Sequence, residues 1–552
     1  MQKTDVLISG AGPAGLILSI DLSRRGIKHI LLNDRPEPSG IPKLDIANTR
    51  TMEILRRLDV IEAVREVGLP TDRPTRSTFK TSLSAKPILS LEPGFSDTPL
   101  VPYSSVDEFN RCIHQYNDGT LPLENNGIVS QMYLEPVLKK HAEQYPEADV
   151  RFNHSFVDFE EHSDGINAAV KDNVSGETYQ VEAGYLVACD GAQSQIRSKL
   201  GIALEGQGQI GEMTSYFLKS EDITNADPLG PPWHCWLTNP ELASMVISLN
   251  FEKDYFNVHV FGCHENTEET LLKVFGKPFE YELLKETHWF VNLLVAESYG
   301  TERVFLAGDS AHQYFPTYGF GYNTAVLDVT NLAWKLAARI QDWGGDTLLA
   351  SYEQEQLSLG KTRRDYSGKG AQMVMTWQSM VKPDIFSNSG AGEQNRQELV
   401  QTIAATHPPL YESLGLELGF RYKSDVVITD GSPEPLSEEK DYLPTTWPGS
   451  RLPHVFLENG DAIFDRLGLG FTLIINGEDS DPTVKKFINA AVLKKVPLKT
   501  LTIDEAWIHE LYEKKYILVR PDQHIAWRGD AIPATPDDLL NQVVGKNRLS
   551  KP

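Results

Sequence analysis

The distribution of apolar residues at the start of the chain predicts a strand, a glycine turn and a helix in immediate succession. Residues 5–9 form a short, mostly apolar run, residues 10–15 read GAGPAG, and apolar residues then recur through positions 16–22. A second apolar run at 29–32 completes the spacing of a βαβ unit. In such a unit, the backbone amides of the turn and the N-terminus of the helix can meet a pyrophosphate. The pattern therefore favours an adenine dinucleotide over a plain structural turn.

The pattern of apolar and polar residues divides the rest of the chain into further units. Strand-type runs dominate from about residue 205 to 290 and predict a separate sheet that could cover a pocket. A strand signal returns at 304–307 and is followed by helical patterns to about residue 380. Residues 384–444 are rich in Gly, Ser, Pro and acids, which indicates a linker, and strand-like runs with helices between them form a last unit.

Composition and charge narrow the class of protein. A chain of 552 residues is too long for one core, and its formal charge of −24 disfavours nucleic acid or an anionic membrane as a partner. It has no uncharged apolar run of about 18 residues, and the first strand begins too early for a signal peptide, so we expect a cytoplasmic protein. The four cysteines show neither zinc spacing nor a disulfide framework, so no metal site is predicted.

Two later segments place an acid and a glycine at the end of an apolar strand. The first ends in Asp190-Gly191 and is followed by Arg197; the second ends in Gly308-Asp309 and runs through a glycine-rich loop into a helix. A carboxylate at a strand end can accept hydrogen bonds from ribityl hydroxyls, and glycines let backbone amides approach a ring carbonyl. The ordered set of three motifs is much harder to obtain by accident than any one of them.

With these motifs in this order, the chain resembles the FAD-dependent aromatic hydroxylases, the single-component flavin monooxygenases that include p-hydroxybenzoate and phenol hydroxylases. The block 308–336 is the most specific part of the resemblance, and segments 448–454 and 518–528 extend it to the phenol hydroxylase and polyketide hydroxylase branch. The implied fold is α/β, with a Rossmann-like FAD-binding domain over 1–75, 100–190 and 295–380, an inserted β-sheet substrate domain over 76–99 and 191–294, a helical or linker region over 381–445, and a thioredoxin-like domain over 446–552. Without a cysteine after Cys263, that last domain is predicted to be redox-inactive.

The resemblance also assigns residues around FAD. The first glycine turn would hold the pyrophosphate, and Asp309 would bind the ribityl region. The loop that follows Asp309 would lie along the isoalloxazine edge. The resemblance implies that NADPH or NADH binds transiently, and the absence of a second G-x-G-x-x-G motif is consistent with this. The implied cofactor-binding residues are Gly10, Gly12, Ala14, Gly15, Asn33, Asp34, Lys43, Gln131, Asp190, Arg197, Gly308, Asp309, Pro316, Gly319, Gly321, Tyr322 and Asn323.

Three positions depart from the family pattern. Asn33 stands where a ribose-binding Glu is usual, and Lys43 replaces an arginine and so loses its fork geometry. Tyr318 replaces a common glycine in the flavin loop and is expected to narrow the pocket or to restrict movement of the flavin. None of these departures excludes FAD.

Three residues are candidates for contact with a substrate. Asp45 matches the active-site aspartate of phenol hydroxylase-like members, and apolar neighbours would suit it as a base with a raised pKa; alternatively it caps a helix or lies in a loop, with Asn48 or Thr49 nearby. His234 could bind a substrate oxygen or be a packed, hydrogen-bonded histidine. Tyr216 could donate to a phenol from a sheet strand or only pack.

The resemblance implies a monooxygenase that uses FAD, NAD(P)H and O2 to hydroxylate a phenolic or polyketide-type aromatic through a flavin C4a-hydroperoxide. Baeyer–Villiger insertion or epoxidation of a related compound is the alternative within this chemistry, and a non-catalytic flavin-bearing binding protein is the alternative from another class. The expected partners are a small aromatic substrate and O2, without nucleic acid or membrane insertion, and a homodimer is compatible with the resemblance.

Overall fold

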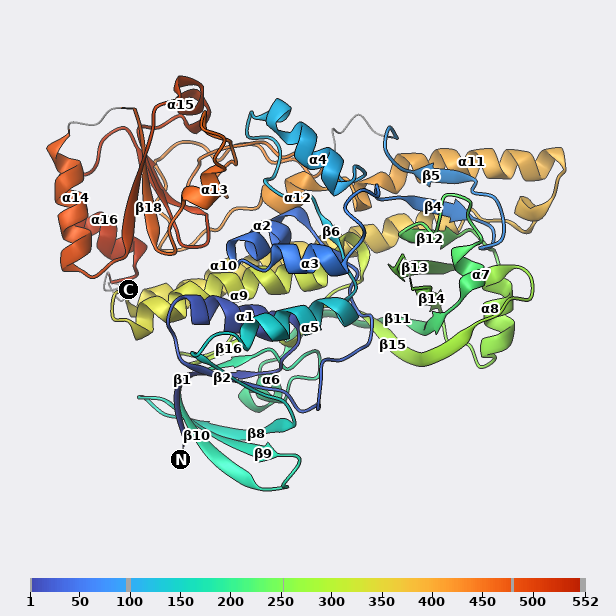
Figure 1. Cartoon of the computed structure of the whole chain (residues 1–552), viewed down its shortest axis with the longest axis horizontal. Helices are drawn as coiled ribbons and strands as arrows, with labels where there is room; N and C mark the ends of the chain where they lie inside the picture. Colours follow the sequence, from blue (N-terminus) through green and yellow to red (C-terminus); the bar gives the residue numbers. More distant parts are fainter. Residues whose placement is uncertain (1, 96–100, 252, 478–480, 547–552) are drawn as a thin grey trace.

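The computed structural model describes residues 2–95, 101–251, 253–477 and 481–546, and it arranges them around three large sheets (Figure 1). The first sheet lies near the N-terminus, the second at one end of the long axis, and the third at the other end (Figure 1). Helices cover the sheets and run between them. This mixed α/β architecture confirms the predicted fold class.

The first sheet brings the ends of the three glycine–acid strands together. Its order is β7-β2-β1-β10-β9-β8, and β16 also pairs with β10. Strand β10 is parallel to both β1 and β16, with Ser9 opposite Ala188 and Ala188 opposite Leu306. The strands are β1 Gln2–Ser9, β2 His29–Leu32, β7 Ala148–Arg151, β8 His154–Glu161, β9 Ile166–Asp172, β10 Thr178–Ala188 and β16 Val304–Leu306. Because carboxyl ends of parallel strands share one edge, all three motif loops leave the sheet at the same place.

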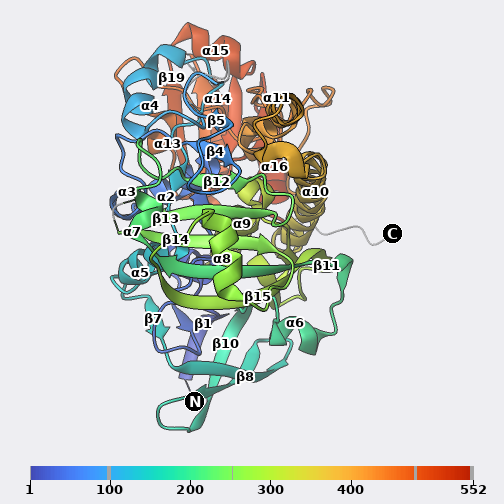
Figure 2. The same cartoon turned by 90° about the vertical axis from the view of Figure 1, so that its right-hand side faces the viewer.

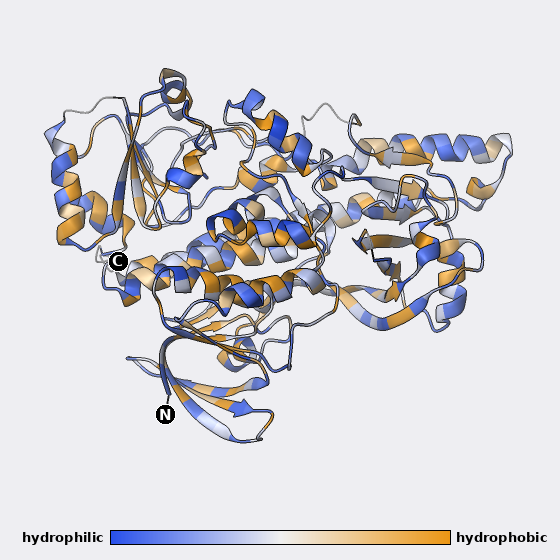
Figure 3. Cartoon of the chain, in the orientation of Figure 1, coloured by the Kyte–Doolittle hydropathy of each residue, from blue (hydrophilic) through white to orange (hydrophobic). Residues whose placement is uncertain are grey.

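Helices pack over this sheet and continue away from it. Helix α1 packs on α5 and α9, and α9 packs on the long helix α10. Most residues of α9 are buried, because it lies between other elements along nearly its whole length (Figure 3). The helices of this layer are α1 Pro13–Arg24, α2 Thr49–Arg57, α3 Ile61–Val67, α5 Gln131–Ala142, α6 Gln195–Leu200, α9 Phe320–Ile340 and α10 Asp346–Gln378.

The second sheet has two faces with different surroundings. Its order is β17-β15-β11-β14-β13-β12-β4-β5, and α8 lies across one face (Figure 2). Apolar residues from alternate positions of β11, β12 and β14 pack with α8, so the intervening positions face the other way. The elements are β4 Ser77–Lys80, β5 Leu89–Leu91, β11 Leu204–Lys219, β12 His234–Leu237, β13 Ser244–Asn250, β14 Tyr255–Phe261, β15 Glu282–Ala296, β17 His312–Gln313, α7 Glu221–Thr224 and α8 Thr267–Phe275.

The third sheet belongs to the C-terminal unit and has the order β19-β18-β20-β21. Strand β18 is parallel to β19 and antiparallel to β20, an arrangement compatible with the predicted thioredoxin-like domain. Trp334 of α9 inserts into the same apolar cluster as Phe471 of β18, which docks this unit on the first domain. The elements are α13 Ile463–Arg466, β18 Phe471–Asn476, α14 Pro482–Leu493, β19 Leu498–Ile503, α15 Ala506–Tyr512, β20 Tyr516–Val519, β21 Ile525–Gly529 and α16 Pro536–Val543.

Short elements join these layers. A ribbon of β3 and β6 lies between the first two sheets, and α11 extends beside β4 and β5 (Figure 1). The bounds are β3 Ile46–Ala47, β6 Gly127–Ile128, α4 Val106–Cys112, α11 Gly390–Thr406 and α12 Leu414–Leu418, with 3-10 turns at Ile113–Tyr116, Gly308–Ser310, Thr317–Gly319, Pro383–Phe386 and Pro408–Leu410. Among the helices in the described ranges, none has the combination of length and apolar character that crossing a bilayer requires.

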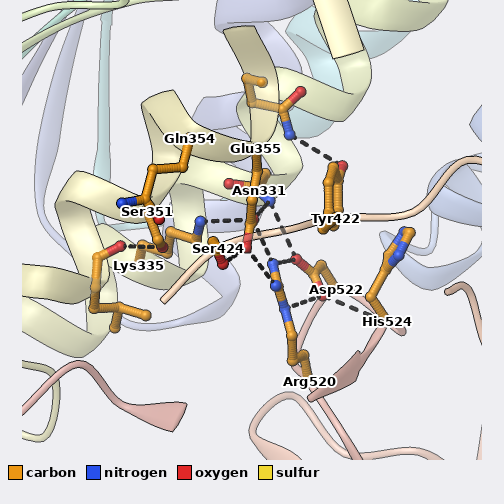
Figure 4. A network of polar contacts seen from close by, with 12 residues as sticks. Asn331, Lys335, Ser351, Gln354, Glu355, Tyr422, Ser424, Arg520, Asp522 and His524 are labelled. Atoms are coloured by element: carbon orange, nitrogen blue, oxygen red, sulfur yellow. Dashed lines mark hydrogen bonds and ion pairs between the residues drawn. The ribbon is translucent and has the colours of Figure 1, made fainter. Parts of the chain in front are cut away.

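A buried charge network fastens the C-terminal unit to α9 and α10 (Figure 4). Both Arg520 Nη atoms donate to Glu355, at 2.7 and 2.8 Å, and the same guanidinium pairs with Asp522 at 2.6 Å. Lys335 of α9 pairs with Glu355 at 2.8 Å. Arg50 of α2 donates to the backbone carbonyl of Asp522 at 2.9 Å. The C-terminal unit is thus joined by charged hydrogen bonds to α10 through Glu355 and to α2 through Arg50, and Lys335 brings α9 into the same network.

Candidate active site

The first glycine turn contains two kinds of glycine. Gly10 has φ +104°, and a Cβ there would lie 2.2 Å from the carbonyl oxygen of Cys189; one on Gly15 would lie 2.0 Å from the carbonyl oxygen of Gly10. Around Gly12, in contrast, no atom lies within 4 Å of such a Cβ. Gly12 is the N-cap of α1, whose first turn has neither a side-chain cap nor an acid. Gly10 and Gly15 are therefore required for packing, whereas Gly12 leaves open the approach to the helix amides, as a pyrophosphate needs.

Asp328 of α9 binds the Gly308-Asp309 segment through buried hydrogen bonds. Asp328 Oδ2 accepts from the backbone amide of Gly308 and pairs with His312 Nε2, both at 2.9 Å. The side chain of Asp309 is exposed, and Ala14 lies close to Gly308 on the neighbouring turn. Asp328 was not predicted from the sequence, because its only signal is one polar residue in an apolar helix.

Asp190 and Arg197 organise the neighbouring loop. Asp190 Oδ2 accepts from the backbone amide of Gln195 at 3.0 Å, and Oδ1 is buried without a protein partner in the described structure. Arg197 donates to the backbone carbonyls of Ser310 and Ala192, at 2.8 and 3.0 Å. The Arg197 guanidinium therefore links the Asp190 loop to the Asp309 segment, and Asp190 retains one carboxylate oxygen without a partner among the described residues.

The loop from Pro316 to Tyr322 turns toward the segment that carries Asp45. Tyr318 has φ +61°, a left-handed conformation that explains why glycine is common at this position, and its ring stacks on Phe320 at 5.0 Å. Gly319 has φ +63°, and its Cβ would lie 2.7 Å from Ile46 Cγ2. Gly321 has open space around it, and the hydroxyl of Tyr322 is buried without a partner among the described residues.

Both polar atoms of the Asn323 side chain form hydrogen bonds within the protein. Its Oδ1 accepts from the Asn48 amide at 2.9 Å and from Thr51 Oγ1 at 2.6 Å, and its Nδ2 donates to the Gly319 carbonyl at 2.7 Å. Asn323 therefore fixes the distance between the predicted flavin loop and the Asp45 segment. Its side chain has no donor or acceptor position left over for a flavin.

The remaining predicted FAD residues lie around the first loop. Asn33 is half-buried at the end of β2, while Asp34 and Lys43 are exposed. Gln131 begins α5; its side chain donates to Glu135 at 2.5 Å and its amide donates to the Leu44 carbonyl at 3.1 Å. Gln131 thereby holds the start of α5 beside Asp45.

Two side chains lie within hydrogen-bonding distance of Asp45: Trp233, which directly precedes β12, and His234, the first residue of β12. Trp233 Nε1 donates to Asp45 Oδ2 at 2.9 Å, and His234 Nε2 lies 2.7 Å from the same oxygen. Within the described residues, Oδ1 has no protein hydrogen bond, and the side chain is 21% exposed. Asn48, not Asp45, caps α2, since its Oδ1 accepts from the Thr51 amide at 3.0 Å. The helix-cap interpretation of Asp45 is therefore wrong.

His234 is hydrogen-bonded on both ring nitrogens. Its Nδ1 lies 3.0 Å from the hydroxyl of Tyr411, which also accepts from Trp236 Nε1 at 2.9 Å and lies 3.0 Å from Ser77 Oγ. Because Nε2 faces a carboxylate, the neutral ring would carry its proton there and accept from Tyr411 at Nδ1. Burial raises the pKa of Tyr411, so this hydroxyl stays protonated. His234 thus contacts Asp45, and Tyr411, from a proline-containing stretch without a recognisable motif, completes the group.

The structure does not bring Tyr216 to this group. Strand alternation turns its side chain to the other face of β11, where it packs with Phe256 and the α8 residue Leu271. The neighbours Ser215 and Phe217 occupy the face that looks toward Asp45. The prediction of a strand was sufficient to place a residue on β11, but the face depends on the register, which one sequence does not reveal.

Comparison with known proteins agrees with this geometry. Residues 3–365 match the family model described as FAD binding domain, and residues 445–547 match that described as aromatic-ring hydroxylase, C-terminal. The FAD-dependent monooxygenase apdD of Emericella nidulans is 31% identical over 98% of this chain and 90% of its own length. The 2,4-dichlorophenol 6-monooxygenase of Cupriavidus pinatubonensis is 28% identical over 96% of this chain and 94% of its own. The rebeccamycin biosynthetic enzyme RebC with reduced flavin superimposes with a TM-score of 0.88 at 28% identity and covers 99% of both chains.

Proposed function

This chain belongs to the FAD-dependent monooxygenases with an aromatic-ring hydroxylase C-terminal domain, and from that premise we propose that it hydroxylates a phenol with Asp45 as the base. One observation carries the proposal: Asp45 Oδ2 is occupied by Trp233 and His234, while Oδ1 has no partner in the described protein. A carboxylate oriented by two fixed donors, with one oxygen left over, is suited to accept a phenolic proton. Removing that proton makes the ring more electron-rich and so more reactive toward an oxygen electrophile.

The residues around the glycine turn fit FAD. The open space at Gly12 and the uncapped first turn of α1 suit the pyrophosphate, and the accessible Asp309 carboxylate suits ribityl hydroxyls. Gly319 and Gly321 allow backbone to approach the ring system, while Asn323 and Arg197 act by holding those loops in place. When bound, FAD supplies the redox chemistry, with NAD(P)H as the reductant and O2 as the source of the inserted oxygen.

The protein orients the substrate and moves its proton. The apolar side chains around Trp233, which include Ile247 and Phe217, would pack on an aromatic ring whose hydroxyl points to Asp45 Oδ1. His234 is a positioning residue, since it contacts Asp45 and not the region next to Oδ1. Its bond to Tyr411 holds the imidazole in one orientation.

The proposal is tested with purified holoenzyme, a panel of phenols and isotopically labelled oxygen gas. We expect phenols to stimulate NAD(P)H oxidation and to give products that carry one labelled oxygen atom. Asp45→Asn should retain flavin absorbance and lose turnover by about 100-fold or more for phenols of ordinary acidity, as expected for loss of a general base. The loss should be much smaller for dinitrophenols, which are already ionised at neutral pH.

Two results would contradict the proposal in different ways. If no phenol stimulates NAD(P)H oxidation and no product gains oxygen, the hydroxylase assignment fails. If Asp45→Asn slows acidic and ordinary phenols equally, Asp45 binds the substrate without acting as a base. Product structures also separate ring hydroxylation from Baeyer–Villiger insertion, because only the latter expands or opens a ring.

A further inference from the structure

A second polar group lies on the same sheet face as His234, and neither the fold nor the phenol chemistry uses it. It consists of Ser215 on β11, Asn257 and His259 on β14, and Trp289 on β15. Trp289 Nε1 donates to Ser215 Oγ at 2.8 Å, and Ser215 Oγ lies 2.7 Å from His259 Nδ1. Asn257 Nδ2 donates to the Pro42 carbonyl at 3.0 Å and lies 3.3 Å from His259 Nε2. We call these four residues the distal polar group.

At least one hydrogen-bond donor of this group has no acceptor among the described residues. If His259 carries its proton on Nε2, Ser215 donates to Nδ1, and the Nε2–H faces only the amide nitrogen of Asn257, which cannot accept. If the proton is on Nδ1, it goes to Ser215 Oγ, which already accepts from Trp289. The Ser215 hydroxyl hydrogen is then the one left over. In either tautomer, at least one donor hydrogen of the group therefore has no acceptor among the described residues.

The group is also uncharged, and two of its four side chains are partly accessible. Burial lowers the pKa of His259 to about 4, against an opposing effect of the Asp45 carboxylate, so the imidazole is neutral at physiological pH. His259 and Trp289 are both half-buried, on the face turned toward the Asp45 segment. Because the group carries no positive charge to offset the burial of an anion, it favours a neutral acceptor, such as a ring carbonyl, over a carboxylate or a phosphate.

The strand register sets the distance to the Asp45 group. His234 pairs with Ile247, and Ile247 pairs with Asn257, so two strand spacings separate β12 from β14. His259 lies two residues further along, which gives a backbone separation of about 12 Å. Between the two groups the face carries Ile247 and Met245, both apolar. A single substituted benzene ring is too short to engage both ends.

We propose that the distal polar group is a second recognition point for the substrate, which selects multi-ring phenols that carry a neutral carbonyl oxygen remote from the hydroxyl. This inference rests on the proposed function, because it takes Asp45 as the partner of the phenol. It adds Ser215 and His259 as specificity-determining residues that have no part in the proton transfer.

The experiment compares dissociation constants for three probes, measured from the change in flavin absorbance of the holoenzyme. The probes are phenol, 2-hydroxyanthracene and 2-hydroxyanthraquinone, of which only the last has ring carbonyls. We expect wild type to prefer the quinone, and Ser215→Ala/His259→Phe to weaken that binding about tenfold, as expected for one unmet hydrogen bond. Binding of the other two probes should change less than twofold.

A matched control is His288→Phe, the same substitution on β15 at an exposed position of the opposite face, which should alter no probe. The proposal is overturned if the double variant binds the quinone as wild type does. It is equally overturned if all three probes weaken together, because that result means general deformation of the site. If wild type turns over phenol without preferring the quinone, the second recognition point fails while the hydroxylase function stands.

Discussion

The charge network between the C-terminal unit and the FAD-binding domain makes a quantitative prediction about stability. Its core contains two cations, Lys335 and Arg520, and two anions, Glu355 and Asp522, whose side chains are at most 4% exposed. The charges balance. Replacing Arg520 with methionine keeps much of the apolar volume and leaves one uncompensated negative charge in a desolvated site.

Losing one partner of a buried ion pair costs about 3–5 kcal/mol, because the remaining charge stays desolvated without its counter-charge. Adding Asp522→Asn restores the balance, since Lys335 and Glu355 remain as a pair. The asparagine can still accept the hydrogen bond from Trp334 Nε1, which is 3.0 Å long in the native protein. The double variant should therefore recover between about 0.5 and 3 kcal/mol relative to additive behaviour of the two single variants.

Urea unfolding followed by tryptophan fluorescence is a direct assay, because Trp334 lies in the network. The control is Lys361→Met, whose ion pair with Glu205 is 42% and 49% exposed and should contribute less than about 1 kcal/mol. An Arg520→Met cost below about 1 kcal/mol would refute the reasoning. The reasoning would also be refuted if the double variant lost as much stability as the two single variants added together, because charge balance would then not govern the network.

Three further predictions concern the cofactor site and the response to acid. Gly12→Ala should leave the apoprotein as stable as wild type and weaken FAD retention, which the flavin content of the purified protein measures. Gly10→Ala should prevent folding, because its Cβ would meet the Cys189 carbonyl, and circular dichroism would show the loss of structure. Asp309→Ala should yield protein without flavin absorbance after purification, and normal absorbance would remove Asp309 from the site. Burial lowers the pKa of His407, His454 and His524 from 6.5 to about 3. Between these two pH values the unfolded state binds more protons than the folded state, so the free energy of unfolding falls as the pH falls. Each histidine contributes about 1.4 kcal/mol per pH unit, and His407→Asn should reduce the slope of unfolding free energy between about pH 6 and pH 4 by that amount.

The sequence was most informative where a backbone requirement selects a residue type. Gly10 and Gly15 are recognisable because no side chain fits there, and the strand predicted at 29–32 coincides with β2. Tyr216 shows the limit, since the strand was predicted but the side chain lies on the other face. Tyr411 shows another, because its contact with His234 joins residues 177 positions apart and leaves no local pattern. Pairings of this kind depend on tertiary packing, which a single sequence does not encode in any short segment.

The C-terminal unit contains no cysteine, yet its contacts reach the helices next to the site. Arg50 joins α2 to Gln523 at 2.7 Å, and Thr51 joins α2 to Asn323 at 2.6 Å. Helix α2 starts four residues after Asp45 and is bound by the C-terminal unit at its second residue, Arg50. Helix α9 starts at the predicted flavin loop and is bound toward its other end, where Trp334 Nε1 donates to Asp522. The C-terminal unit therefore contacts both helices that follow the segments expected to position the substrate and FAD. A loosened network should therefore first change the distance between the Asp45 segment and the flavin loop, before it affects either binding motif. The stability measured at Arg520 is in this sense also a measure of how firmly the site is held.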